Sequence, residues 1–215
     1  MDCNEQCLDS KLWRQSVMLE VDGDLFRADP ESVGLVAITT NALVGRRGYA
    51  VMGKGVALQA AQHWPGIDRV LGERVLGERL KAQEGAVGGG GGGNHVHLLT
   101  ACASSIGAFG VGFAHTVGYT VGGVDGLMAP WHIASFPVKR HWKNSADVEL
   151  IRRSCDELRM LVGYIDAAER GFSDKRIALP RPGCGAGGLA WSDVREIVER
   201  GLPGKRYLVV ERTRV

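Results

Sequence analysis

The stretch Arg176–Glu211 reads RIALPRPGCGAGGLAWSDVREIVERGLPGKRYLVVE, and it determines the fold class more clearly than any other part of the chain. Its two apolar runs, 176–180 and 206–211, predict strands. Between them, a glycine-rich loop leads into residues 192–200, where apolar residues at helical spacing predict a helix. Strand, loop, helix and strand in this order form the repeating unit of α/β proteins with a largely parallel sheet.

The same alternation continues upstream of this unit. Hydrophobic periodicity and turn residues predict four further strands at 17–21, 33–39, 95–100 and 132–138. They also predict helices at 56–64, at 70–80 and at 144–171, the last capped by Asn144. We therefore expect a three-layer α/β/α sandwich with a mixed, largely parallel six-stranded sheet. Ligands of such folds bind at the carboxyl ends of the strands.

Length and composition indicate one globular domain over residues 1–215. The chain is 45% hydrophobic and 23% charged, and its formal net charge of +2 comes without a basic tail. This balance argues against nucleic-acid binding by bulk electrostatics. The five cysteines are odd in number and form no C-x-x-C pair, and the first residues lack the apolar segment of a signal peptide. We expect a cytoplasmic monomer without structural zinc.

A glycine-rich segment interrupts the α/β pattern at about residues 85–130. Between Gly85 and Gly126 lie 14 of the 31 glycines, and no charged residue occurs from Gly85 to Val124. The segment is long enough to span a bilayer, which takes about 20 residues, but it is rich in Gly, Ser and Thr and poor in Leu and Ile. We therefore expect a flexible surface insertion and no membrane association.

Two glycine-rich loops could bind phosphate. The first, GYAVMGKG at 48–55, approaches a P-loop, but Gly55 stands where a P-loop has the Ser or Thr that holds magnesium. The second, GCGAGG at 183–188, fits G-x-G-x-x-G, but only four residues follow the next strand, so we do not expect a dinucleotide fold. Glycines before a helix still present backbone amides to a phosphate or diphosphate.

Two polar residues follow predicted strands. Asp24 comes after the first strand, where its carboxylate can accept a hydrogen bond from an exocyclic amine or can equally cap a turn. Asn41 comes after the second strand, where its amide can hold a ribose diol or can form a strand-end turn. Neither residue decides between its two roles by itself.

Five motifs together resemble the macro domain family: GDLF, TTN, AVMGKGVALQ, FPVKRHW and LPRPGCGAGGLAW, in that order along the chain. The chain is most similar to the branch of bacterial antitoxin, phage and terminal ADP-ribose glycohydrolase macro domains. The resemblance implies ADP-ribose binding, with Asp24 on the adenine, Leu25 among the substrate-binding residues and Asn41 near the distal ribose. It places two loops around the diphosphate: Met52, Gly53, Lys54, Gly55 and Val56, and Gly183, Cys184, Gly185, Ala186, Gly187, Gly188 and Leu189.

The resemblance implies a hydrolase that removes a group from the distal ribose. The reaction would be de-ADP-ribosylation, or hydrolysis of ADP-ribose 1″-phosphate or O-acetyl-ADP-ribose, without a cofactor. Two departures keep a non-catalytic ADP-ribose reader open as the alternative: LQAAQHW lacks the nucleophilic lysine of related glycohydrolases, and Gly187 replaces their aspartate. The catalytic candidates are then Asn41, Lys54 and His141, with Lys139 and Asp193 as further ionisable groups. The partner would be ADP-ribose or an ADP-ribosylated macromolecule.

Overall fold

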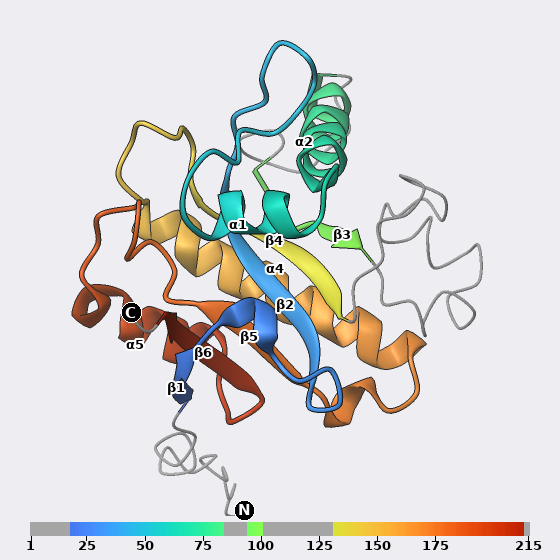
Figure 1. Ribbon diagram of the computed structural model, residues 1–215, viewed down its shortest axis with the longest axis vertical. Helices are drawn as coiled ribbons and strands as arrows, with labels where there is room; N and C mark the ends of the chain where they lie inside the picture. The colour runs from blue at the N-terminus through green and yellow to red at the C-terminus, as the bar shows by residue number, and fades with distance from the viewer. Residues whose placement is uncertain (1–17, 84–93, 101–130, 213–215) are drawn as a thin grey trace, which may run out of the picture.

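A six-stranded sheet forms the centre of the molecule (Figure 1). The computed structural model describes residues 18–83, 94–100 and 131–212. The strand order is β1-β6-β5-β2-β4-β3, and every neighbouring pair is parallel except the edge pair β3 and β4. The strands are β1 (Leu19–Gly23), β2 (Val33–Asn41), β3 (Leu98–Thr100), β4 (His132–Lys139), β5 (Arg176–Pro180) and β6 (Tyr207–Arg212).

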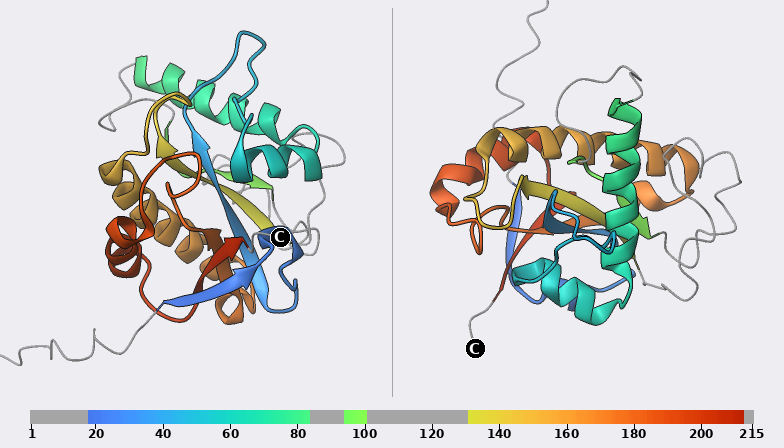
Figure 2. Two further views of the ribbon diagram at one scale, coloured as in Figure 1. Left: turned by 60° about the vertical axis from the view of Figure 1, so that its left-hand side comes forward. Right: turned by 90° about the horizontal axis from the view of Figure 1, so that it is seen from above.

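Helices cover both faces of the sheet (Figure 2), which confirms the three-layer α/β/α prediction. In the buried strand β2, Leu35 and Ala37 belong to the core beneath α4 and α5, whereas Val36 and Ile38 belong to the core beneath α1 and α2. A strand covered on both sides needs apolar residues at consecutive positions. The helices are α1 (Gly55–His63), α2 (Ile67–Gln83), α4 (Val148–Ala168) and α5 (Trp191–Gly201), with short 3-10 turns η2 (Leu25–Arg27) and η4 (Phe172–Asp174).

The long helix α4 begins later than its sequence pattern predicts. Asp147, and not Asn144, is the N-cap, since its carboxylate accepts hydrogen bonds from the amides of Glu149 and Leu150. The prediction of Asn144 as the cap is therefore wrong. The backbone amide of Asn144 instead closes a turn by donating to the carbonyl of His141 at 3.1 Å. The turn residues preceding α4 thus belong to a loop at the carboxyl edge of the sheet.

The edge strand β3 is shorter than the predicted strand at 95–100. His95 and Val96 are held by α4 instead of by a strand: His95 Nδ1 lies 2.7 Å from Glu157 Oε1, and the Val96 amide donates to Glu157 Oε2 at 2.8 Å. The predicted insertion at 85–130 lies almost entirely outside the described residues. Among the helices within the described ranges, none is long and apolar enough to cross a membrane.

The contact between His95 and Glu157 should make stability depend on pH. The hydrogen bond to Glu157 raises the pKa of His95 above its usual value of 6.5. Burial raises the pKa of Glu157, but the hydrogen bonds from His95 and Val96 outweigh this and lower it below 4.5. The stabilisation that His95 contributes is complete below the unfolded-state pKa of His95 and is lost as the pH rises through its folded-state pKa. The stabilisation that Glu157 contributes is lost as the pH falls through the lowered pKa of Glu157.

We therefore expect the free energy of unfolding of the parent protein to be higher at pH 5.5 than at pH 8.5. We expect this difference between the two pH values to be smaller in the variant His95→Gln. Asn and Gln side chains can still hydrogen-bond but do not titrate in this range. The measurement is the free energy of unfolding from urea titrations of both proteins at both pH values. Equal pH dependence of parent and variant would show that this pair does not contribute to it.

Candidate functional site

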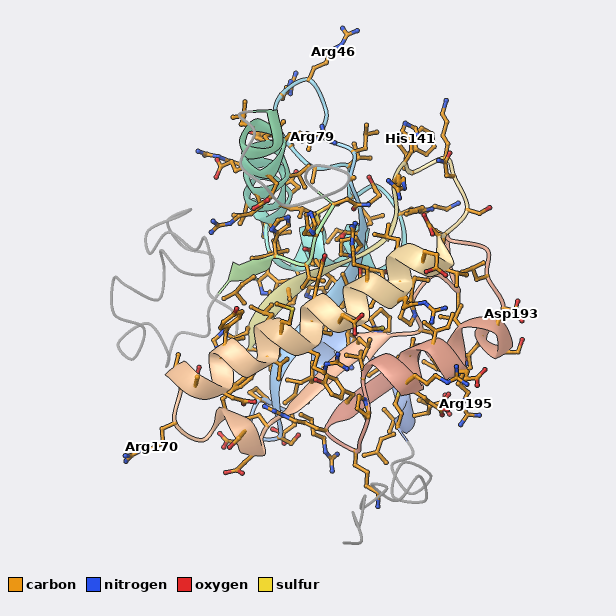
Figure 3. The ribbon with its side chains drawn as sticks, turned by 180° about the vertical axis from the view of Figure 1, so that it is seen from behind. Arg46, Arg79, His141, Arg170, Asp193 and Arg195 are labelled. Atoms are coloured by element: carbon orange, nitrogen blue, oxygen red, sulfur yellow. The ribbon has the colours of Figure 1, made fainter. Side chains whose placement is uncertain are left out.

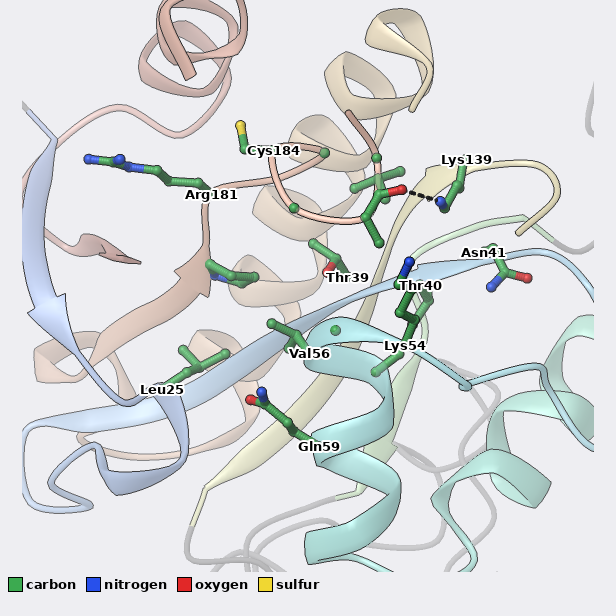
Figure 4. Close-up of a pocket in the computed structure, with 18 of the residues that line it drawn as sticks. Leu25, Thr39, Thr40, Asn41, Lys54, Val56, Gln59, Lys139, Arg181 and Cys184 are labelled. Carbon is green, nitrogen blue, oxygen red and sulfur yellow. Dashed lines mark hydrogen bonds between the residues drawn. The ribbon is translucent and has the colours of Figure 1, made fainter. Parts of the chain in front are cut away.

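A cavity of about 950 Å³ opens at the carboxyl edge of the sheet (Figure 4). All five parallel strands contribute to it, as expected for a ligand site in an open α/β sheet. The lining residues are Gly23, Asp24, Leu25, Thr39, Thr40, Asn41, Val51, Gly53, Lys54, Gly55, Val56, Ala57, Gln59, Val138, Lys139, Trp142, Lys143, Pro180, Arg181, Gly183, Cys184, Gly185, Ala186, Gly187, Val210 and Glu211.

The acidic and basic side chains that line the cavity are unevenly distributed, apart from Arg181, which follows β5 and is ion-paired with Glu211. Its carboxylates, Asp24 and Glu211, follow β1 and end β6, which are paired strands on one side of the sheet. Its lysines, Lys54, Lys139 and Lys143, lie on the side of β2 and β4. In Figure 4, Leu25 marks the first end and Asn41 the second. An elongated ligand with a hydrogen-bond donor at one end and negative charge beyond it fits this polarity.

Asp24 caps a turn, which is one of the two roles that its sequence position allows, and keeps one oxygen for the other. Its Oδ1 accepts a hydrogen bond from the Phe26 amide at 3.0 Å and so caps η2. Its Oδ2 lies 3.7 Å from the Nε of Arg27, whose side chain is 87% exposed. Exposed pairs of this kind contribute little, so Oδ2 remains available to a ligand. The turn thus fixes the carboxylate, and one oxygen is left to face the cavity.

The N-terminus of α1 lies at the middle of the cavity. Gly53, Lys54, Gly55, Val56 and Ala57 all line it, and the N-cap residue Lys54 forms no capping hydrogen bond with its side chain. The first amides of a helix have no partner within the helix and carry the positive end of its dipole. Gly55 adopts a positive φ of 62°, which favours glycine at this turn. The geometry suits an anion such as a diphosphate.

The second glycine loop faces the N-terminus of α1 from across the cavity. Gly183 has a φ of 76°, and its carbonyl lies only 2.3 Å from the position that a Cβ on Gly187 would occupy. The Gly187 carbonyl accepts a hydrogen bond from the Ala146 amide at 2.9 Å, which joins this loop to the loop that follows β4. Burial raises the pKa of the Cys184 thiol to about 11, so this cysteine is protonated near neutral pH.

Lys139 joins the same two loops by its side chain. The residue is only 8% exposed, and its ammonium donates to the carbonyls of Ala186 at 2.8 Å, Trp142 at 3.2 Å and Asn144 at 3.3 Å. These three bonds use all three donors of the ammonium group. Burial, and secondarily the positive charge of Lys54, lowers the pKa of Lys139. Lys139 therefore holds the shape of the site, whereas Lys54 extends into it (Figure 4).

Asn41 is held rigidly at the end of β2. Its Nδ2 donates to the Val51 carbonyl at 2.9 Å, and its Oδ1 accepts from the Leu43 amide at 2.8 Å. A carboxamide has two N–H donors, so one N–H of Asn41 remains for a ligand or a water molecule. The hydrogen bond to Val51 also fixes the chain just before the loop 52–56. Asn41 thus forms the strand-end turn and keeps one N–H for the ligand role that its sequence position leaves open.

The structure brings together most of the residues that the sequence suggests for the site, but four of them do not line the cavity. Met52 and Leu189 pack against the two apolar cores, and Gly188 provides a positive φ of 77° at the turn before α5. His141 also lies outside the lining, since its ring stacks against Trp142 and accepts a hydrogen bond from the Lys143 amide. Asp193, the further ionisable candidate, lies on α5 outside the lining and accepts from the Ser192 hydroxyl.

Several lining residues fall within or beside the motifs that carry the family resemblance, but nothing in their local sequence marks them as site residues. Trp142 and Lys143 reach the cavity only because the loop after β4 folds back over it, and Gln59 reaches it from the exposed side of α1. Arg181 lines the cavity while its guanidinium binds Glu20 at 3.0 Å and Glu211 at 2.6 Å. Thr39 and Thr40 also line the cavity, and the sequence could have predicted this. They directly precede Asn41, and the last residues of a parallel strand border such sites.

Comparisons with known proteins give a consistent result. No family model matches the sequence. The chain is 29% identical over 174 residues to the DNA ADP-ribosyl glycohydrolase of Mycobacterium tuberculosis, which covers 81% of this chain and 35% of the relative. It is 37% identical over 82 residues to a DNA ADP-ribosyl transferase-DNA ADP-ribosyl glycohydrolase fusion protein of Thermosipho africanus, covering 36% of this chain and 19% of the relative. The chain thus spans only about a third of the length of the longer-matching relative.

Two solved structures resemble the fold. The macrodomain of Thermus aquaticus DarG superposes with a TM-score of 0.53 and 23% identity, covering 92% of this chain and 99% of that one. Thermosipho africanus DarTG in complex with ADP-ribose superposes with a TM-score of 0.52 and 22% identity, covering 91% and 42%. At this level of identity the likeness concerns the arrangement of strands and helices.

Proposed function

We propose that this chain, which has the macrodomain fold, binds ADP-ribose in the cavity and hydrolyses the bond between its distal ribose and a modified group, with ADP-ribosylated DNA as the substrate class. One observation carries the proposal: the order of chemical groups along the cavity matches the order of groups in ADP-ribose. The name DNA ADP-ribosyl glycohydrolase, which several relatives carry, supports the choice of DNA.

The match runs from one end of the cavity to the other. The free oxygen of Asp24 suits the exocyclic amine of adenine, and Leu25 offers an apolar contact to the ring. The N-terminus of α1, with Lys54 and the loop 183–187, suits the diphosphate. Asn41 lies beyond these groups, where the distal ribose would follow. Contacts to the diphosphate and a charged hydrogen bond to the adenine together support a dissociation constant in the micromolar range. This corresponds to a binding free energy of about −8 kcal/mol.

The reaction would need little covalent chemistry from the protein. The oxygen of one water molecule bonds to the anomeric carbon of the distal ribose, the bond from that carbon to the leaving group breaks, and the leaving group takes up a proton. The remaining N–H of Asn41 orients the water, the second lone pair of its Oδ1 accepts from the ribose hydroxyl, and Lys54 neutralises the diphosphate. Positioning of this kind lowers a barrier mainly by orientation.

The variant Asn41→Ala tests the catalytic part of the proposal. If Asn41 orients the reacting groups, its loss should reduce the turnover rate at least tenfold, about 1.4 kcal/mol in the barrier, and weaken ADP-ribose binding much less. The measurements are single-turnover release of ADP-ribose from modified DNA and calorimetry with free ADP-ribose. Modified protein and ADP-ribose 1″-phosphate serve as alternative substrates. A rate that falls only in proportion to affinity would remove the catalytic role from Asn41.

A non-catalytic reader is the second candidate, and a specific observation favours it. Among the described residues that line the cavity, the carboxylates are Asp24 and Glu211, and both lie at the end opposite Asn41. The distal end therefore offers amide and ammonium groups but no general base. A parent protein that binds ADP-ribose and releases nothing from any substrate in the panel would establish the reader.

We also propose that residues 1–215 act as one domain, with the segment at about 85–130 as an insertion, and that the domain is a cytoplasmic monomer. Both apolar cores share the same sheet, which supports a single unit. The odd number of cysteines and the absence of C-x-x-C pairs support a reducing compartment. Light scattering during size-exclusion chromatography, at a mass near 23.1 kDa, tests the monomer.

A further inference from the structure

Glu211 is a carboxylate of the cavity to which the proposed function gives no role. It lies near the end of β6 and lines the cavity. Its Oε1 lies 2.6 Å from the Nη1 of Arg181, and its side chain has no other ion pair or hydrogen bond among the described residues. One oxygen of the carboxylate is therefore available to accept a hydrogen bond from a ligand.

The strand order places Glu211 between two parts of the cavity that the proposed function assigns. Asp24 directly follows β1, and the loop 183–187 follows β5. The strand β6 lies between β1 and β5 in the sheet, and its Glu211 pairs in register with Asp22 of β1. A ligand with its adenine at Asp24 and its diphosphate at the loop would therefore have its adenosine ribose at Glu211.

The segment from β5 to β6 also has the element order of a dinucleotide-binding unit. Its two strands are parallel neighbours, joined by the G-x-G-x-x-G loop and α5. In dinucleotide-binding folds, an acidic residue about 20 residues beyond the glycines accepts a hydrogen bond from a ribose hydroxyl. Glu211 has this position relative to Gly188. The sheet as a whole has a different strand order, so the correspondence is limited to this unit.

Arg181 lies beside Glu211 in the wall of the cavity. Its Nη2 donates to Glu20 Oε2 at 3.0 Å, and its guanidinium lies 5.3 Å from the ring centroid of Trp191. In Figure 4, Arg181 extends from the end of β5 toward β1, away from Asn41. A guanidinium is well suited to bind a phosphate through two parallel hydrogen bonds. Because both terminal nitrogens already face carboxylates, a phosphate could bind Arg181 only by displacing one of them.

Glu20 holds Arg181 in place independently of Glu211. Its Oε2 also accepts a hydrogen bond from Trp191 Nε1 at 2.9 Å. Its Oε1 lies 3.0 Å from the Nε of Arg195, which extends from α5 (Figure 3). Loss of the Glu211 carboxylate would therefore leave the guanidinium at the wall of the cavity, with one terminal nitrogen released.

The charge at this end of the cavity disfavours a phosphorylated ribose. Arg181 carries one positive charge between the carboxylates of Glu20 and Glu211, so these three side chains together are negative. Asp24 adds a further carboxylate. A phosphate on the adenosine ribose would meet this negative charge, whereas an unphosphorylated ribose would donate a hydroxyl to Glu211. Like-charge contacts of this kind are a usual source of specificity.

We propose that Glu211 selects ligands whose adenosine ribose carries no phosphate. Its free oxygen accepts a hydrogen bond from a ribose hydroxyl, and its charge and its contact with Arg181 exclude a 2′-phosphate. The proposal rests on the proposed function, since it takes ADP-ribose as the ligand, and it narrows the substrate class to ADP-ribose units derived from NAD and not from NADP. Glu211 determines specificity and is not catalytic, because it lies at the end of the cavity opposite Asn41.

The test is calorimetry of the full chain with ADP-ribose and with ADP-ribose phosphorylated at the 2′ position of its adenosine ribose. The parent should bind ADP-ribose at least about tenfold more tightly than the phosphorylated ligand. In Glu211→Gln this ratio should fall to about threefold or less, because the released Arg181 binds the phosphate. The affinity for ADP-ribose should change by less than about threefold, since glutamine still accepts a hydrogen bond.

Two further variants identify the source of the change. The double variant Glu211→Gln/Arg181→Gln should lose the gain in affinity for the phosphorylated ligand. The matched control Glu196→Gln removes the same charge from α5, where Glu196 pairs with Arg200 and does not line the cavity. This control should leave both affinities unchanged. A purely structural role of Glu211 would weaken both ligands alike, so the ratio of the two affinities separates selection from folding.

Three results would overturn the role of Glu211: equal affinity of the parent for the two ligands, a ratio that Glu211→Gln leaves unchanged, or a gain for the phosphorylated ligand that survives the loss of Arg181. Each can occur while the parent still binds ADP-ribose, in which case the proposed function of the cavity stands. Absent heat with ADP-ribose in the parent would instead refute the proposed function and, with it, the role of Glu211.

Discussion

Replacing Gly187 by alanine should lower the free energy of unfolding by about 3 kcal/mol and reduce ADP-ribose affinity at least tenfold, because the new Cβ would lie 2.3 Å from the Gly183 carbonyl and 2.8 Å from the Ala146 Cβ. Neither atom can rotate away, because the first belongs to the backbone and the second is a Cβ fixed to it. The loop 183–187 must therefore move, and with it the backbone amides that we propose bind the diphosphate. For a chain of this length the melting temperature should fall by about 6 to 12 °C.

Gly185→Ala is the matched control for this substitution. It adds the same methyl group two residues away, where no atom outside the neighbouring residues lies within 4 Å. Its melting temperature should stay within about 1 °C of the parent. The measurements are thermal melts and calorimetry with ADP-ribose. Similar melting temperatures for the two variants would mean that the contact between Gly183 and Gly187 does not restrain the loop.

Asp24→Asn should weaken ADP-ribose binding by about 10- to 150-fold, which corresponds to the loss of one charge-assisted hydrogen bond of about 1.5 to 3 kcal/mol. Asparagine retains the oxygen that caps η2 through the Phe26 amide. It cannot offer a second acceptor to the adenine amine, since its amide nitrogen is a donor. The prediction is therefore a loss of affinity without a loss of melting temperature.

Two further variants separate the contributions of the Asp24 carboxylate. Asp24→Ala removes the cap as well and should lose both affinity and some stability. Asp22→Asn removes a neighbouring exposed carboxylate of β1 that does not line the cavity, and should leave ADP-ribose binding unchanged. Calorimetry that gives Asp24→Asn and Asp22→Asn the same affinity as the parent would remove Asp24 from the binding site.

Strand and helix types were accessible to sequence analysis because they depend on neighbouring residues. The apolar run at 33–39 predicts the central strand, and β2 indeed carries apolar side chains to both cores. The resemblance to macro domains, based on five short motifs, is confirmed by the fold of the solved structures. Helix ends were less accessible, since Asn144 and Asp147 are both good caps and only the turn at His141 decides between them.

The candidate site, like the fold, was only partly predictable from the sequence. The sequence by itself determined that the chain is an α/β protein, that two glycine loops and the residues Asp24 and Asn41 lie at strand ends, and that such ends meet at one edge of a sheet. These conclusions need only periodicity, turn chemistry and the geometry of parallel strands.

Only the tertiary structure decided how those strand ends are combined. The register that pairs Asn41 with Lys139 sets the positions of the loops that follow β2 and β4, buries the Lys139 ammonium beneath three carbonyls and brings Trp142 to the cavity. The same contacts leave His141 outside the cavity lining. Such placements depend on hydrogen bonds between residues far apart in the chain, and local periodicity carries no information about them.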